Sequence, residues 1–142
     1  IANNVHLAGL FNYGLVTSRS DNTGFLSDVS DLKTSQFNVG MVVSGLGRNN
    51  NLMSLNLSQP LRVESGFTNL NIPGRLDQNG NVTHTTKRLS LEPSGRELNL
   101  DLGFEMKLFN GAFKIGSQLM FDAIHMESNN SETVYGIFKT SF

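Results

Sequence analysis

The sequence predicts an all-β protein, specifically an antiparallel up-and-down β-barrel that crosses a membrane. Three observations predict this class: six long runs in which apolar and polar residues alternate, connections that are alternately long and short, and a weakly charged composition without any long apolar stretch. Alternation with a period of two is typical of strands that have one face in an apolar and the other in a polar environment. The runs span residues 5–16, 36–47, 53–63, 97–109, 113–125 and 133–142.

The first three runs carry their apolar residues at odd positions. In residues 5–16 the odd positions hold large side chains such as Phe11, and the even positions are mostly small or polar. Residues 36–47 and 53–63 repeat this arrangement, with Met41 in the middle of the earlier run. Each run therefore predicts a strand with two chemically different faces.

The fourth run is the most regular of the six, and the last two follow the same scheme. Residues 97–109 place leucine, phenylalanine or methionine at every even position and mainly charged or small residues at the odd ones, which no helical period explains. Residues 113–125 and 133–142 continue the alternation. Ordinary strands have about 5–6 residues, whereas a tilted strand needs about 9–11 to cross a bilayer. Length and alternation together favour a membrane barrel.

The connections between these strands are alternately short and long. The short ones lie at 47–51 and 109–112, and the second contains Asn110-Gly111, a favoured pair for a tight hairpin. The long connections span about 19–35, 66–95 and 127–132. Outer-membrane barrels have this asymmetry, with short periplasmic turns and longer extracellular loops.

Length and composition limit the class further. A chain of 142 residues suits a single domain over 1–142. With 11 basic and 12 acidic residues the net charge is −1, which argues against a nucleic-acid partner. The charged fraction of 16% lies below the usual value of about 25%. No apolar stretch approaches the roughly 20 residues of a membrane-spanning helix, so we expect strands rather than helices in a membrane.

Two segments carry a family resemblance: LSQPLRVESG at 57–66 and LSLEPSGRELNLDLGF at 89–104. They are similar to the C-terminal region of proteobacterial subtilisin-like serine peptidases of the autotransporter type, and the similarity runs from about Leu52 to Phe142. The resemblance implies a translocator or anchor in the bacterial outer membrane, a barrel of twelve strands of which this chain supplies the C-terminal six. That barrel would pass or tether an upstream passenger, a subtilisin-like protease, at the cell surface.

The resemblance also implies partners. These are outer-membrane lipid and lipopolysaccharide, the barrel assembly machinery, the upstream passenger and the remaining barrel strands. A final alternating strand with Phe138 and a terminal Phe142 resembles the assembly signal of outer-membrane proteins. Thr140 departs from that pattern, which more often has an aromatic residue there.

Catalytic and metal chemistry is not indicated in this segment. Neither the nucleophile segment nor the histidine segment of subtilisin-like enzymes occurs, and the pair Ser94-Gly95 is interpreted as a turn. His6 and His125 have no metal-ligand spacing and are expected at strand margins. Asp77-Gln78-Asn79-Gly80 resembles the start of a calcium loop but lacks its closing glutamate, so we interpret it as a turn. We therefore predict that this segment is not an enzyme and that it binds neither a cofactor nor a metal.

A set of charged residues of mixed sign falls on the faces opposite the apolar ones. Inside a barrel, neighbouring strands would bring opposite charges within reach, where they pair favourably. We predict that these residues face a polar lumen: Arg62, Glu64, Glu97, Asp101, Glu105, Lys107, Lys114, Asp122 and Lys139.

Two alternatives to six membrane strands stay open. Splitting residues 53–72 at Gln59-Pro60, and counting residues 82–91 as a strand, gives an eight-stranded barrel. In the six-stranded version, Pro60 must instead sit where no N–H donor is needed. The other alternative is a soluble β-sandwich, a surface or adhesion module that binds a ligand through its long loops.

Overall fold

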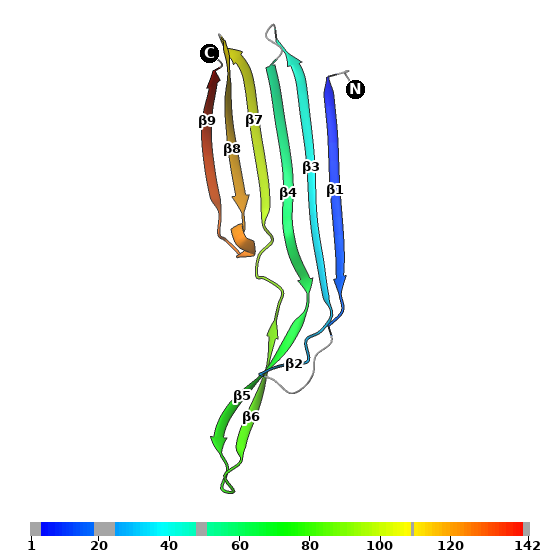
Figure 1. Ribbon diagram of the computed structural model, residues 1–142, viewed down its shortest axis with the longest axis vertical. Helices are drawn as coiled ribbons and strands as arrows, with labels where there is room; N and C mark the ends of the chain where they lie inside the picture. Colours follow the sequence, from blue (N-terminus) through cyan, green and yellow to red (C-terminus); the bar gives the residue numbers. More distant parts are fainter. Residues whose placement is uncertain (1–3, 19–24, 48–50, 109, 141–142) are drawn as a thin grey trace. The chain divides into compact units, whose positions relative to one another are not determined.

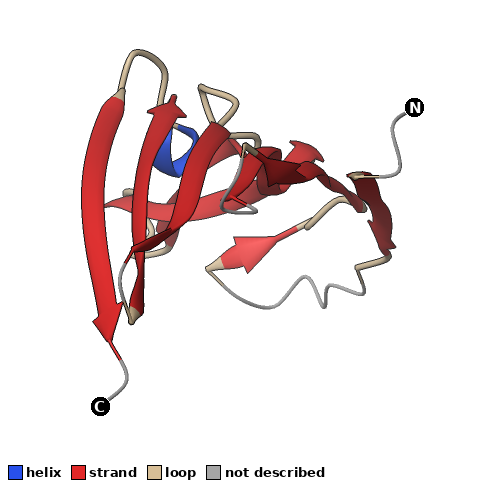
Figure 2. Cartoon of the chain, turned by 90° about the horizontal axis from the view of Figure 1, so that it is seen from above, coloured by secondary structure: helices blue, strands red, loops and turns tan. Residues whose placement is uncertain are grey.

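The computed structural model describes residues 4–18, 25–47, 51–108 and 110–140, and it is an all-β fold built from antiparallel strands (Figure 1). This confirms the prediction of an all-β protein with antiparallel strands. Figure 2 shows how little of the described chain is helical, namely one short 3₁₀ turn. The elements are β1 (Val5–Val16), β2 (Leu26–Ser27), β3 (Leu32–Leu46), β4 (Asn51–Ser65), β5 (Phe67–Leu76), β6 (Val82–Ser90), β7 (Leu98–Leu108), β8 (Gly111–Phe121), η1 (Ala123–His125) and β9 (Ser131–Thr140).

Six of the strands form one sheet in the order β1-β3-β4-β7-β8-β9. The six strands lie side by side in the same order as they occur along the chain, and β1 and β9 form the two edges (Figure 1). Over the described residues the sheet is open, and no closed barrel is formed. The five strands β1, β3, β4, β7 and β8 have 11 to 15 residues and β9 has 10, as the long alternating runs predict.

The remaining strands form a smaller sheet in the order β2-β5-β6. The chain divides into two compact units, each defined by the contacts among its own residues. The first unit comprises Ile1–Asn12, Gln36–Pro60 and Ser94–Phe142, and the second comprises Tyr13–Ser35 and Leu61–Pro93. Most of the large sheet belongs to the first unit, and the small sheet belongs to the second.

The segment expected as a long connection at 66–95 contains two strands. β5 and β6 pair from Phe67 opposite Ser90 to Leu76 opposite Val82, with an irregular register between Pro73 and Leu76. Pro73 is still paired with His84, so the irregularity begins after it, at Gly74 and Arg75. Polar residues occupy much of both strands, so the alternation of hydropathy that reveals the other strands is weak here.

Several strand ends differ from the predicted ones. β8 ends at Phe121, four residues before the run 113–125 ends, because Asp122 has a φ of 49° and a left-handed residue cannot continue a strand. β3 begins at Leu32, inside the connection expected at 19–35. β9 begins at Ser131 rather than after 132.

The course of β4 bears on the eight-stranded alternative. β4 runs without a break through Gln59 and Pro60, so the turn that this alternative requires is not formed. The pairing of β4 with β7 ends at Ser58. Pro60 therefore lies beyond that ladder, where it withholds no hydrogen bond from β7.

Apolar side chains do not form a buried core. Among the described residues no apolar side chain is buried, and the buried polar or charged side chains belong to Ser27, Ser35, Gln59, Arg62 and Thr68. This is the reverse of an ordinary soluble domain, in which leucine, isoleucine, valine and phenylalanine fill the interior. In the described part of the chain, no helix has the length and hydropathy to span a bilayer.

Candidate functional site

The large sheet has one apolar face, which the register between strands assembles from the alternating residues. Phe104 of β7 lies opposite Met53 of β4 on one side and Ile115 of β8 on the other. Phe113 of β8 lies opposite Phe138 of β9. Because one strand's alternation matches its neighbour's, the apolar residues share a face across β4, β7, β8 and β9.

Residues of this apolar face are exposed across the sheet. The exposed fraction is 68% for Phe11 in β1, 52% for Val39 in β3 and 73% for Val134 in β9. Val39 lies on the apolar face because its neighbour Gly40 faces Asn56 on the polar one, and Phe11 shares the face of Gly9, which lies beside Val39. Leu102 and Ile115, in the middle of the sheet, are also exposed. A large apolar area of this kind marks a surface that contacts protein or membrane.

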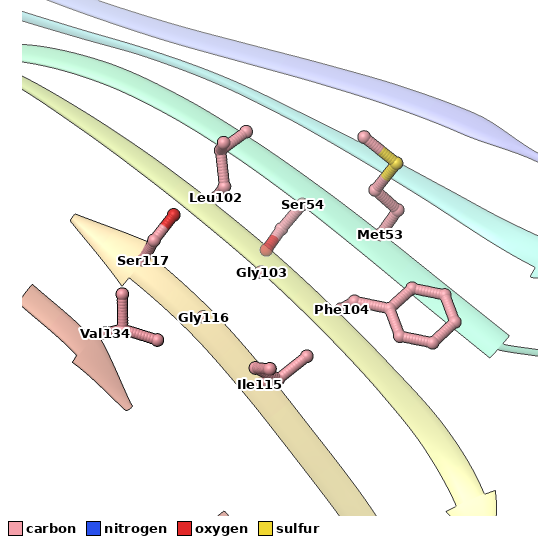
Figure 3. A pocket seen from close by; sticks show the side chains of 9 residues that line it. All are labelled: Met53, Ser54, Leu102, Gly103, Phe104, Ile115, Gly116, Ser117 and Val134. Atoms are coloured by element: carbon pink, nitrogen blue, oxygen red, sulfur yellow. The ribbon is translucent and has the colours of Figure 1, made fainter. Parts of the chain in front are cut away.

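A depression of about 290 Å³ lies in the apolar face (Figure 3). Ser117 occupies the row between Leu102 and Val134, where its small side chain leaves space between two larger ones. Figure 3 shows Leu102 and Val134 on either side of Ser117, with Ile115 beyond. Among the described residues the Ser117 hydroxyl has no hydrogen-bond partner, and it is the one polar side chain in this row of the apolar face.

The opposite face of the large sheet is polar and carries five of the nine residues predicted to line a lumen. Those five are Asp101, Glu105, Lys107, Lys114 and Lys139, and each lies on the face opposite the apolar rows. Asn56 donates a hydrogen bond to Asp101 over 3.2 Å between Nδ2 and Oδ2. Glu105 lies directly opposite Lys114 in the register. The Lys114 side chain approaches Gly103, so no ion pair with Glu105 forms within 4 Å in the described residues.

A row of small residues crosses the polar face beneath one tyrosine. Ser54, Gly103 and Gly116 lie side by side, and Tyr135 completes the row. The Tyr135 ring covers Gly116 so closely that a Cβ at that glycine would overlap the ring. Sequence reasoning missed this row, because only the register brings residues from four strands together. A sequence signal exists in the two glycines, which both fall at polar-face positions of their runs.

Two more predicted lumen residues, Arg62 and Glu64, belong to a hydrogen-bonded network in the second unit. Arg62 is 7% exposed and its Nη1 lies 2.7 Å from Oε2 of Glu64. Its Nη2 lies 3.3 Å from Oε1 of Glu92 and 3.1 Å from the carbonyl oxygen of Pro93. Ser35 donates a hydrogen bond to Glu64 over 2.5 Å. The network joins β3 and β4 to the segment after β6.

The last two predicted lumen residues, Glu97 and Asp122, hold the loop after β8 rather than a strand face. Glu97 accepts a 2.6 Å hydrogen bond from the backbone N–H of Ile124. Asp122 accepts from the backbone N–H groups of Arg96 at 3.2 Å and Ser128 at 2.9 Å. These bonds fix a strained loop, since Ile124 is β-branched and has a φ of 55°.

The histidines lie as follows. His125 is half-buried in η1, and its Nδ1 accepts a 3.0 Å hydrogen bond from the backbone N–H of Glu97, which requires the ring proton to be on Nε2. His6 is exposed in β1 and His84 is exposed in β6. In the described residues no group of three or more histidine, aspartate and glutamate side chains could hold a metal ion.

Asp77 forms a turn at the tip of the β5–β6 hairpin. Its Oδ1 accepts from the backbone N–H groups of Asn79 and Asn81, each at 2.8 Å, and its Oδ2 accepts from the Asn81 amide at 3.1 Å. Hydrogen bonds from the Asn81 backbone and then its side chain, with smaller ones from Asn79 and Gly80, lower the pKa of the Asp77 carboxyl. The segment is a turn, as the sequence predicts, and the bonds to the Asp77 carboxylate show that it is of the Asx type.

Sequence reasoning also missed two residues: Gln59, just past the end of the β4–β7 pairing, and Arg96, two residues before β7 begins. Gln59 is 2% exposed, and Arg96 donates a 2.5 Å hydrogen bond to its Oε1. A buried glutamine beside an apolar strand pattern gives no sequence signal of its own.

Of the predicted assembly signal, Phe138 is 56% exposed on the apolar face of β9, and Phe142 lies outside the described residues.

Compared with known proteins, the chain matches no family model, no curated protein and no solved structure.

Proposed function

We propose that the chain is a membrane-embedded segment of an outer-membrane β-barrel, which acts as a translocator or anchor for an upstream passenger. One observation carries the proposal: six long strands assemble an apolar face, yet no apolar side chain of the described residues is buried. In water such a face would be covered by a second layer of structure. Acyl chains would cover it in a bilayer, without a second protein layer.

The strand lengths and the polar face agree with this environment. β7 and β8 each have 11 residues, as many as a tilted strand needs to cross the hydrocarbon core. Opposite the apolar rows, Asp101, Glu105 and Lys114 would face an aqueous interior. That interior would hold or pass the segment connecting the barrel to its passenger. The mechanism is physical, so we assign no catalytic residue to this chain.

The edge strands define what else the proposal requires. Within the described residues β1 and β9 each have one neighbour in the sheet, so each leaves a row of backbone N–H and C=O groups without a strand partner there. Such groups cannot remain unpaired in hydrocarbon. Closed single-chain barrels have eight or more strands. The proposal therefore includes further antiparallel strands that pair with β1 and β9.

The proposed partners and location follow from the resemblance and from the chemistry of the faces. The apolar face would contact outer-membrane lipid, and the connections at the long-loop end would meet lipopolysaccharide at the cell surface. Phe138 would belong to the signal read by the barrel assembly machinery. The passenger would be a subtilisin-like protease, with its catalytic residues outside this segment.

Bilayer contact can be tested with tryptophan fluorescence, because the chain has no tryptophan of its own. Leu102→Trp places the indole on the apolar face, and Gln118→Trp, a matched control on the neighbouring strand, places it on the polar face. In vesicles of lipids with brominated acyl chains, we expect strong quenching for Leu102→Trp and little for Gln118→Trp. Equal quenching at both positions would contradict a lipid-facing and a lumen-facing side.

A soluble β-sandwich is the alternative that the same experiment tests. The lack of a buried apolar layer in the described residues argues against it, because a sandwich buries the inner faces of two sheets. A sandwich would give protein that stays monodisperse without detergent, and neither tryptophan would be quenched by the lipids. That outcome would replace the membrane proposal with a surface module that binds a ligand through its long loops.

A further inference from the structure

A cavity of about 680 Å³ lies in the second unit, beside the base of the β5–β6 hairpin. Its lining includes Phe67 and Arg88 from the two strands, together with the carboxylates of Asp31 and Glu92. Backbone contacts fix one wall: the N–H of Ser30 donates to the Phe67 carbonyl at 2.9 Å, and the N–H of Phe67 donates to the Ser30 hydroxyl at 2.8 Å. These two hydrogen bonds fix the backbone of that wall.

The guanidinium of Arg88 lies against the ring of Phe67. Phe67 is opposite Ser90 in the hairpin and Arg88 is opposite Asn69, so the two side chains are diagonal neighbours on one face. The Cζ atom of Arg88 lies 3.6 Å from the centroid of the ring. A cation over an aromatic face is attracted by the ring quadrupole. This contact stabilises the guanidinium against the ring, and Arg88 is exposed to the solvent.

The charged side chains that line the cavity differ in their hydrogen-bond and ion-pair partners. Glu92 is paired with Arg62 at 3.3 Å. Asp31 accepts a 3.3 Å hydrogen bond from the backbone N–H of Ser18. The Arg88 guanidinium, by contrast, has no hydrogen bond or ion pair within the described part of the chain, and it contacts the ring of Phe67. The cation Arg88 is thus the charged group of the lining whose side chain lacks a polar partner, and its N–H donors are arranged as a planar fork.

We propose that this cavity binds a carboxylate group through the Arg88 guanidinium. The planar fork of arginine matches the two oxygens of a carboxylate in a bidentate arrangement. Ser90 adds a donor, because its oxygen already accepts from the N–H of Glu92 at 3.2 Å and its hydroxyl proton remains to donate. Asp31 and Glu92 in the same wall disfavour a dianion, so the ligand class is a monocarboxylate rather than a phosphate.

This site belongs to the second unit and does not depend on whether the large sheet lies in a membrane. The test is an NMR titration of the full chain with sodium acetate, at constant ionic strength, that follows the Arg88 Nε–H resonance. We expect a saturable shift, and at least a fivefold loss of acetate affinity in Arg88→Ala. Arg88→Lys keeps the charge but loses the planar fork of donors. Its acetate affinity should lie between that of the unsubstituted protein and that of Arg88→Ala.

Lys87→Ala is the matched control, because Lys87 is the adjacent residue on the opposite face of β6 and removing it changes the net charge equally. It should change the acetate affinity less than twofold. Inorganic phosphate serves as the competing anion and should bind more weakly than acetate. An equal effect of Lys87→Ala, tighter binding of phosphate, or no saturable shift at Arg88 would each overturn the proposal. A folded Arg88→Ala variant is recognised by unchanged resonances of β5 and β6 residues away from the cavity, such as Ile72 and Thr85.

Discussion

The two sheets of this protein are organised by different interactions. In the large sheet, side chains sort by hydropathy onto two faces, and the hydrogen bond between Asn56 and Asp101 is one of few between side chains of its strands. In the small sheet, polar side chains connect the strands: Thr86 donates to Asn71 and Asn71 donates to Ser27. Most side chains of β5 and β6 are exposed, but their polar groups suit water.

This difference shows what each sheet needs from its surroundings. The small sheet satisfies its polar groups internally and in water. The large sheet leaves apolar residues such as Leu102, Ile115 and Val134 uncovered, so its stability depends on a medium or partner that covers them. Four changes test this contrast, and they follow from the largest expected effect to the smallest.

The largest effect is expected for a charge on the apolar face. Leu102→Arg should destabilise the protein in lipid by about 2–4 kcal/mol, the cost of arginine near the middle of a bilayer on the lipid face of a barrel. Urea unfolding in vesicles measures the change. Gln118→Arg, on the polar face of the adjacent strand, is the control and should cost much less. Equal losses for the two variants would remove the distinction between the faces.

The next effect concerns the network of the second unit. Arg62→Ala leaves the half-buried Glu64 and the more exposed Glu92 without their cation, which should cost about 1–3 kcal/mol. Hydrogen exchange of β5 and β6 amides should rise, while that of β7 and β8 should not. Arg75→Ala removes an exposed arginine of the same unit and should have little effect. If exchange rose equally in both sheets, the two regions would not be independent.

A smaller effect is expected at the covered glycine of the polar face. Gly116→Ala would push the Tyr135 ring away, and overpacking of this kind costs about 1–3 kcal/mol. We expect the lower end, because the ring is at the surface of the sheet. Gly136→Ala is the control, since its Cβ would meet the Phe113 ring at an ordinary 3.9 Å. Thermal unfolding in detergent measures both variants, and a stable Gly116→Ala protein would show that the ring has an alternative position.

The smallest effect is a local response to pH at the hairpin tip. The pKa of Asp77 is lowered in the folded protein, so its contribution to stability is present above the ordinary pKa of about 3.9 and is lost as the pH falls through the lowered value. Amide resonances of Asn79 and Asn81 should shift in that acidic range. The resonances of β7 and β8 should stay unchanged at that transition. Asp77→Asn should abolish the acidic transition at the tip.

The alternation of side chains predicted most of the large sheet. Leu98 to Leu108 were predicted as a strand because their alternation fits no other period, and the structure places them in β7. The short connection at Asn110 was also predicted. Gly111, however, serves a further purpose that no turn pattern indicates: a Cβ there would overlap the backbone of Lys139 in β9.

The predicted site was recovered only in part, because charge alone does not distinguish a strand face from a loop anchor. Lys107 and Lys139 share the polar face, while Glu97 and Asp122 accept backbone hydrogen bonds from a loop. All four look alike as charged residues in alternating runs. β8 ends at Phe121, one residue before Asp122, because Asp122 has a left-handed backbone conformation. The aspartate side chain does not by itself dictate that conformation.

By itself, the sequence determined that this protein is all-β and that its long strands have one apolar and one polar face, because a period of two acts within a single strand. The tertiary structure decided which strands are neighbours, since pairing joins residues such as Phe67 and Ser90 that are far apart in the chain. It also decided that Tyr135 covers Gly116 and that Arg88 stacks on Phe67. These contacts depend on register, and register is set by the whole sheet rather than by any one run of residues.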